Sequence, residues 1–180
     1  MRMGLFSRDH AEQKANRGSS EEPGYAAYAG HGELVLIVDD SRTFVHSARR
    51  LLEGHGYRTV SAADGLEALE VAQDTRPDLV LMDIVMPRMN GFEATRKLTR
   101  APGTRDIPIV LVSATELESD KYWAMRQGAR GYLAKPIRKR ALLAAVSGII
   151  GESRRLHGRS ARIPVLTEVV SAPSRVAATA

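Results

Sequence analysis

The sequence predicts a doubly wound α/β fold, in which a five-stranded parallel sheet carries helices on both faces. Five short apolar runs alternate over residues 33–150 with five segments whose apolar residues recur at helical spacing. The first run, Leu34 to Val38, is continuously apolar, which is typical of a strand buried on both faces. Because strands that alternate with helices pair in parallel through right-handed crossovers, we expect one sheet with helices above and below it.

Each strand is expected at one of the apolar runs. The runs cover Leu34–Val38, Tyr57–Ser61, Leu79–Met82, Ile107–Val112 and Gly131–Ala134. Ser41 and Asp64 stand where side-chain caps open the first two helices, and Gly54 and Pro77 end these helices. The other three helices are expected over 91–100, 116–127 and 137–150. In such a fold the binding crevice lies beyond the carboxyl ends of the strands.

Composition narrows the class of protein. The chain has 180 residues and is 43% apolar, which suits one domain with an ordinary core. It has no cysteine, so disulfides, thiolate metal sites and cysteine nucleophiles are excluded. No apolar run approaches the roughly 18 residues that span a bilayer, and residues 1–32 lack the apolar stretch of a signal peptide. We therefore expect a soluble, cytoplasmic protein that does not contact a membrane.

The two ends of the chain are expected to be flexible. Residues 1–32 form a leader rich in Gly, Ser, Ala and charge, and residues 151–180 form a basic tail. The tail has five basic and two acidic residues, so it contributes +3 of the net charge of +5. It has no aromatic residue for stacking on bases, which argues against nucleic-acid binding. Within it, Ile163 to Val170 is apolar enough to form a short docking element.

Acidic side chains follow two of the expected strands. Asp39 and Asp40 follow the first strand and Asp83 follows the third, so the three carboxylates should meet at one edge of the sheet. Carboxylates this close repel one another unless a cation intervenes. Oxygen ligands without His or Cys suit Mg2+, which accepts one or two carboxylates together with water and phosphate oxygens. The alternative is that Asp39 and Asp40 merely cap the helix near Ser41, but one cap would suffice.

Residues at the ends of three strands indicate phosphate chemistry. The carboxylate of Asp83 stands on a loop and is able to act as a nucleophile that becomes an aspartyl phosphate. Lys135 is expected to reach the phosphate as a point charge, and the alternative is an exposed lysine of no special role. Pro136 favours a lysine that reaches the phosphate, because an X-Pro peptide bond after a strand can adopt the cis form, which would direct the lysine inward. The hydroxyl of Ser113 is placed to hydrogen-bond a phosphoryl oxygen.

Together these residues resemble the receiver domain of two-component response regulators. The resemblance lies in Asp39-Asp40, Asp83, Ser113 and Lys135-Pro136, with thirty positions from Asp83 to Ser113, and it covers residues 33–150. It implies a flavodoxin-like sheet with strand order 2-1-3-4-5. It also implies a signalling switch with weak intrinsic autodephosphorylation, and not an enzyme that acts on an outside substrate.

The resemblance gives each residue of the site a role. It makes Asp83 the phosphoacceptor. The magnesium ligands that it implies are Asp40, Asp83 and the backbone carbonyl of Val85, with Asp39 acting through water. Ser113 and Lys135 would contact the phosphoryl group. Tyr132 would be the aromatic switch whose ring moves with Ser113, whereas its sequence context alone indicates an ordinary strand residue.

Within the family, three stretches resemble the PilH-type regulators of twitching motility. They are Leu81 to Pro87, Asn90 to Arg96 and Trp123 to Arg130. This resemblance implies a chemotaxis-type histidine kinase, simple or hybrid, as phosphoryl donor, and a role in type IV pilus twitching or chemotaxis-like control. A downstream protein target would bind the face formed by residues 116–150. Trp123 is a candidate contact on that face, and partial core packing is the alternative.

Three other functions compete with this switch. A phosphate sink or relay receiver in another two-component pathway would use the same site. A phosphatase or phosphotransferase of the haloacid-dehalogenase type also uses an aspartate nucleophile, but it needs a second acid two residues later, where this chain has Val85. A DNA-binding regulator is disfavoured, because the roughly 30 residues after the last helix show no helix-turn-helix pattern. Signalling through protein contacts is therefore expected.

Overall fold

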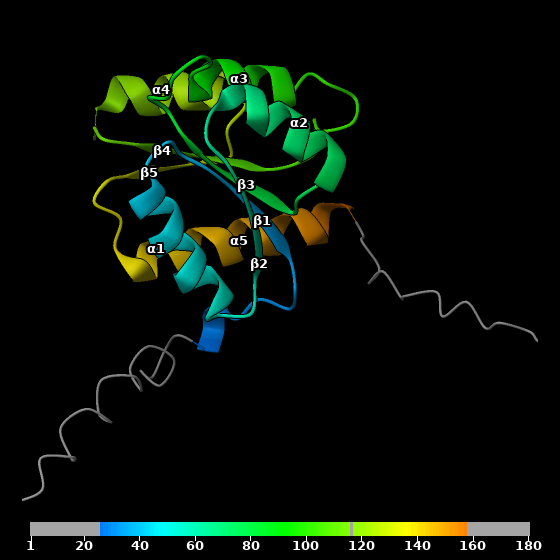
Figure 1. Ribbon diagram of the computed structural model, residues 1–180. Helices are drawn as coiled ribbons and strands as arrows, with labels where there is room; N and C mark the ends of the chain where they lie inside the picture. The colour runs from blue at the N-terminus through cyan, green and yellow to red at the C-terminus, as the bar shows by residue number, and fades with distance from the viewer. Residues whose placement is uncertain (1–25, 116, 158–180) are drawn as a thin grey trace, which may run out of the picture.

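The computed structural model describes residues 26–115 and 117–157, which form one parallel sheet with helices on both faces (Figure 1). The strands are β1 (Leu34–Val38), β2 (Arg58–Ala62), β3 (Leu79–Asp83), β4 (Ile109–Ser113) and β5 (Gly131–Ala134). The helices are the 3-10 helix η1 (Ala26–Tyr28), α1 (Arg42–Glu53), α2 (Gly65–Thr75), α3 (Gly91–Leu98), α4 (Glu118–Arg126) and α5 (Lys139–His157). The predicted doubly wound α/β fold is confirmed.

The strands lie in the order β2-β1-β3-β4-β5, and every neighbouring pair is parallel. This is the order that the resemblance implied. From β1 the chain crosses to β2 on one side, whereas β3, β4 and β5 follow on the other side, so the direction of winding reverses between β1 and β3. Ligands of open α/β sheets bind at such a reversal, beyond the carboxyl ends of the strands. Asp39 and Asp83 lie at this point.

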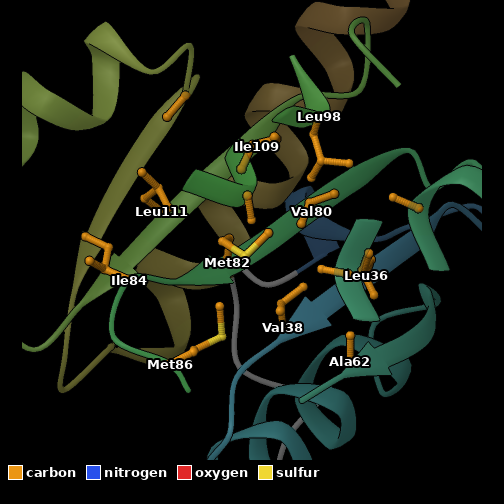
Figure 2. Packing of buried hydrophobic residues seen from close by; sticks show 14 of the residues in the cluster. Leu36, Val38, Ala62, Val80, Met82, Ile84, Met86, Leu98, Ile109 and Leu111 are labelled. Carbon is orange, nitrogen blue, oxygen red and sulfur yellow. The ribbon is translucent and has the colours of Figure 1, made fainter. Parts of the chain in front are cut away.

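Two apolar cores hold the layers together. Successive strand residues point to opposite faces, so each continuous apolar run contributes to both cores. On the face covered by α2, α3 and α4, shown in Figure 2, the strands contribute Leu36, Val38, Val80, Met82, Ile109 and Leu111. On the face covered by α1 and α5 they contribute Val35, Ile37, Leu79, Leu81 and Val110. Because the sheet is packed on both faces, the carboxyl ends of its strands are held in fixed positions.

Local sequence fixes the start of the helices beside the site. Ser41 caps α1, because its hydroxyl accepts a hydrogen bond of 3.4 Å from the backbone N–H of Phe44. Asp64 caps α2 in the same way. The fourth strand begins at Ile109, later than the expected Ile107, since the intervening proline has no N–H to donate to the strand ladder. In the described residues, none of the helices has the length and hydropathy needed to cross a membrane.

The structured part of the chain extends beyond residues 33–150. The last helix, α5, continues to His157 instead of ending at Ile150, and an ion pair of 2.6 Å joins its Arg154 to the buried Glu33. This polar contact was not predicted, because the apolar pattern of the helix stops earlier.

Near this ion pair, the carbonyl of Tyr28 in η1 accepts a hydrogen bond of 3.1 Å from the hydroxyl of Tyr57. Residues assigned to the leader therefore contact the body of the protein. The start of the fourth helix at Glu116, most of the predicted flexible leader and most of the predicted basic tail, including its apolar segment 163–170, lie outside the described residues.

Candidate functional site

Three of the predicted residues meet at the carboxyl edge of the sheet. Asp39 follows β1 and is 3% exposed, and Asp83 ends β3 and is 6% exposed. Lys135 follows β5, and its Nζ donates hydrogen bonds of 2.6 Å to Asp39 Oδ2 and 2.7 Å to Asp83 Oδ1. The peptide bond between Lys135 and Pro136 is cis. The two hydrogen bonds of Nζ show that the lysine points into the site.

Two buried carboxylates share one ammonium in this arrangement. If Asp39 and Asp83 are both ionised and Lys135 is protonated, the three groups carry a net charge of −1. This negative charge favours the binding of a further cation.

Asp40, the next residue after Asp39, is exposed. With Asp39 it lines a polar pocket of about 350 Å3 between α1 and the start of α2. Arg42 and Arg49 also line this pocket, so it holds charges of both signs.

The donor set fits Mg2+ in kind but is not a ready-made cage. Among the described residues, no three His, Cys, Asp or Glu side chains converge closely enough to hold a metal ion by themselves. Magnesium does not need such a cluster, because it usually takes one or two carboxylates and completes its octahedron with water and phosphate oxygens. Asp39, Asp40 and Asp83 are all oxygen donors, so the site suits this ion.

Burial and pairing act against each other on the two central groups. Burial raises the pKa of Asp83, and the hydrogen bond and charge of Lys135 offset only part of this effect. Burial would lower the pKa of Lys135, but its hydrogen bonds to Asp39 and Asp83 and their negative charges outweigh burial, so this pKa is raised. The lysine therefore stays protonated more firmly than an ordinary lysine.

The loop after β3 holds the Asp83 carboxylate from the other side. The backbone N–H of Val85 donates a hydrogen bond of 2.8 Å to Asp83 Oδ2. Further along the loop, Arg88 forms an ion pair with the buried Asp64 at the start of α2. The loop ends at Gly91, where a Cβ would overlap the carbonyl oxygen of Asp83. The sequence analysis missed the roles of Arg88 and Gly91, since neither shows in a hydrophobic pattern.

A second chain of contacts joins β4 to β5 through a residue that the sequence analysis did not single out. Ser113 ends β4 and is buried, and its Oγ accepts a hydrogen bond of 3.1 Å from the backbone N–H of Thr115. The hydroxyl of Tyr132 in β5 donates a hydrogen bond of 2.6 Å to the carbonyl of the same Thr115. Thr115 therefore connects the two residues that the resemblance implied as a switch pair.

An aromatic ring also lies against the lysine. The ring of Phe44 in α1 is centred 4.5 Å from Lys135 Nζ. The sequence analysis did not single out Phe44. Helical spacing shows which face of α1 is apolar, but it does not show that this end of the face meets a residue from the far end of the chain.

This fold and this site together define a class of protein. A parallel sheet with the order 2-1-3-4-5 carries paired acids beside an aspartate and a lysine at its carboxyl edge, as in receiver domains. The family model of the response regulator receiver domain matches residues 35–147, and the chain belongs to this family. Receiver domains are signalling switches rather than conventional enzymes, and they interact with histidine kinases and with downstream targets.

Individual relatives are similar over the same part of the chain. Protein PilH of Pseudomonas aeruginosa PAO1 is 44% identical over 116 residues, which are 64% of this chain and 96% of PilH. The crystal structure of a CheY-like receiver domain protein from Methanospirillum hungatei JF-1 matches with a TM-score of 0.65 and 26% identity, over 69% of this chain and 98% of that one.

One similar structure holds a metal. It is the receiver domain of the sensor histidine kinase PA1611 from Pseudomonas aeruginosa PAO1, with a magnesium ion coordinated in its active site cleft. The TM-score is 0.63 and the identity 32%, over 67% of this chain and 98% of that one.

Proposed function

We propose that this chain is a cytoplasmic phosphorylation switch in which Asp83 accepts a phosphoryl group from a histidine kinase. The observation that carries the proposal is how the Asp83 carboxylate is held. One oxygen accepts a hydrogen bond from Lys135 and the other accepts one from the N–H of Val85. A carboxylate fixed at both oxygens meets a phosphodonor in one orientation, which favours its action as a nucleophile.

The transfer itself needs few groups. An oxygen of Asp83 forms a bond to phosphorus while the P–N bond of the kinase phosphohistidine breaks, and the imidazole nitrogen keeps the electron pair. Lys135 then pairs with a phosphoryl oxygen, and the hydroxyl of Ser113 donates to another. When bound, Mg2+ would neutralise part of the negative charge of the carboxylates and the phosphoryl group. The residues that would hold it are Asp40, Asp83 and the carbonyl of Val85, with Asp39 acting through water.

The charge of the phosphoryl group affects the rest of the domain through Ser113 and Thr115. If Ser113 turns toward the phosphoryl group, its hydrogen bond with Thr115 weakens, and the carbonyl of Thr115 is the acceptor for Tyr132. This chain of contacts supports a population shift on the face formed by residues 116–150. Trp123 lies on that face and is 53% exposed, which supports a direct contact with the downstream target.

The similarity to PilH supports a place in type IV pilus twitching motility, with a chemotaxis-type histidine kinase, simple or hybrid, as the donor. A phosphate sink or relay receiver in another two-component pathway would use the same chemistry. Hydrolysis of the aspartyl phosphate returns the switch to its resting state. A phosphatase of the haloacid-dehalogenase type has less support, because the place of its second acid is taken by Val85, which is apolar and 75% exposed.

The proposal is tested with acetyl phosphate and Mg2+ on the full chain. The wild type should gain one acid-labile phosphoryl group, and Asp83→Asn should gain none. Asp106→Asn makes the same chemical change at an exposed aspartate and serves as the control, which should be labelled like the wild type. Equal labelling of Asp83→Asn and wild type would overturn the assignment.

A further inference from the structure

We propose that Phe44 is a positioning residue for Lys135, and that its ring keeps the ammonium between Asp39 and Asp83 until it pairs with the incoming phosphoryl group. The inference rests on the proposed function for its effect on the transfer rate. Its structural part, the position of the ammonium, stands independently of that function. The observation behind it is the 4.5 Å separation between Lys135 Nζ and the centre of the Phe44 ring.

The ammonium of Lys135 is enclosed by three groups. Two of its N–H bonds are used on Asp39 and Asp83, and the aromatic ring covers a further side of the charge. The face of an aromatic ring carries negative electrostatic potential and attracts a cation within about 6 Å of its centre. Asp39 follows β1, Asp83 ends β3 and Phe44 belongs to α1, so the charge is held from three separate parts of the fold.

The position of Phe44 is itself fixed. Its backbone N–H donates a hydrogen bond to the hydroxyl of the cap residue Ser41. Phe44 therefore belongs to the first turn of α1, and its backbone position is fixed by the helix start. Its side chain is half-buried and packs against the core on the α1 and α5 face. The helix start and the apolar packing together limit where the ring lies relative to the lysine.

The space next to Lys135 explains why its ammonium needs a positioning residue. A groove of about 400 Å3 lies between α1 and the start of α5, and its lining includes Phe44, Ala48, Leu51, Lys135, Ile137 and Leu142. The lysine side chain is long and flexible, and this groove offers its stem an alternative position away from the carboxylates. The Phe44 ring lines the groove beside the ammonium and favours the position between the carboxylates through its attraction for the charge.

Simple core packing is the rival role for Phe44, and substitutions separate the two. Phe44→Leu keeps an apolar side chain of similar reach but removes the aromatic face. Phe44→Tyr keeps the face. If Phe44 only fills space, leucine should serve as well as phenylalanine. If the ring positions the cation, tyrosine should restore what leucine loses. Leu51→Ala is the matched control, because it enlarges the same groove without removing the ring.

Two measurements on the full chain test the proposal, after circular dichroism has shown that each variant folds. The first is the proton chemical shift of the Lys135 ε-methylene in unphosphorylated protein, which the ring current of Phe44 displaces. The displacement should vanish in Phe44→Leu and persist in Phe44→Tyr and Leu51→Ala. The second is the rate of labelling by acetyl phosphate with Mg2+. It should fall about three- to tenfold in Phe44→Leu and stay within about twofold of wild type in the other two.

Several outcomes would overturn the inference. An unchanged methylene shift in Phe44→Leu would mean that the ring does not lie over the lysine. Slow labelling of Phe44→Tyr or Leu51→Ala, equal to that of Phe44→Leu, would assign the effect to packing. If the wild type is not labelled at all, the proposed function fails, whereas the shift measurement still decides whether Phe44 positions Lys135.

Discussion

Lys135 donates a hydrogen bond of 2.7 Å to Asp83 although the whole of β4 separates their strands in the sheet. The side chain spans the end of β4, and the same ammonium also pairs with Asp39 at 2.6 Å. One lysine therefore balances part of the charge of two buried carboxylates. The stability of the site therefore depends on this lysine. The negative charge that the lysine leaves unbalanced favours the binding of a second cation.

Removing the ammonium should destabilise the fold. In Lys135→Met the side chain keeps its length, but Asp39 and Asp83 are left buried without a cationic partner. The free energy of unfolding should fall by about 1 to 3 kcal/mol, less than for a fully buried pair because the Lys135 side chain is 26% exposed. Denaturant unfolding at neutral pH without Mg2+ measures the change. The control is Lys121→Met, which breaks an exposed pair with Glu118 and should cost at most about 0.5 kcal/mol. Equal losses in both variants would contradict the account.

The raised pKa of Asp83 predicts a pH-dependent stability with a definite sign. The folded state binds this proton more tightly than the unfolded state, because burial disfavours the carboxylate. As the pH rises from below the ordinary value of 3.8 through the raised folded pKa, ionisation of Asp83 therefore lowers the free energy of unfolding. Asp83→Asn removes this loss, so it should be more stable than wild type at neutral pH and lose its advantage in acid.

Unfolding of both proteins in Mg2+-free buffers from acid to neutral pH checks this prediction. A constant difference between Asp83→Asn and wild type at every pH would contradict it. Lys135 acts in another range: its raised pKa adds stability below the ordinary value of 10.5, and this is lost as the pH rises through the folded pKa.

Two glycine substitutions should have opposite effects on stability. In Gly91→Ala the new Cβ meets the carbonyl oxygen of Asp83, so the helix start or the strand end must shift, at a cost of about 1 to 3 kcal/mol. In Gly148→Ala the Cβ meets nothing within 4 Å on α5, and the helix should gain about 0.5 to 1 kcal/mol. Denaturant unfolding compares them. Two changes of the same sign would show that the close approach of Gly91 to Asp83 is not what limits this position.

Magnesium should stabilise the folded protein through the acidic edge. A concentration one hundred times the dissociation constant adds about 2.7 kcal/mol, which thermal unfolding detects. Asp40→Asn should weaken binding about tenfold in calorimetric titration, because it removes a charged oxygen ligand. Glu67→Gln, in the same polar pocket but outside the proposed ligand set, is the control and should bind like wild type. Equal weakening in both variants would mean that only the general charge of the pocket matters.

The fold and the centre of the site were predictable because both depend on backbone topology. Asp39, Asp83 and Lys135 each follow an apolar run, and parallel strands bring such ends to one edge whatever the side chains do. The predicted cap at Ser41 was likewise a local feature, settled by residues three positions apart. Tyr132 stood out only through the family resemblance, since its strand context is ordinary.

The missed features depend on side-chain direction between distant segments. Phe44 of α1 meets Lys135, which follows β5, and Arg154 of α5 meets Glu33, which precedes β1, so each contact joins segments that lie far apart in the sequence. Thr115 connects to Tyr132 through a backbone carbonyl, a group that every residue has and that no sequence pattern marks. The length of α5 also escaped prediction, because a polar contact rather than an apolar stripe accompanies its last turns.

The most direct test of the central claim is to identify the residue that carries the phosphoryl group. The full chain is treated with acetyl phosphate and Mg2+, reduced with borohydride, digested and analysed by mass spectrometry. Reduction converts an aspartyl phosphate into homoserine, so the account predicts homoserine at position 83 and at no other aspartate. Homoserine at position 39 or 40, or its absence throughout in labelled protein, would contradict it.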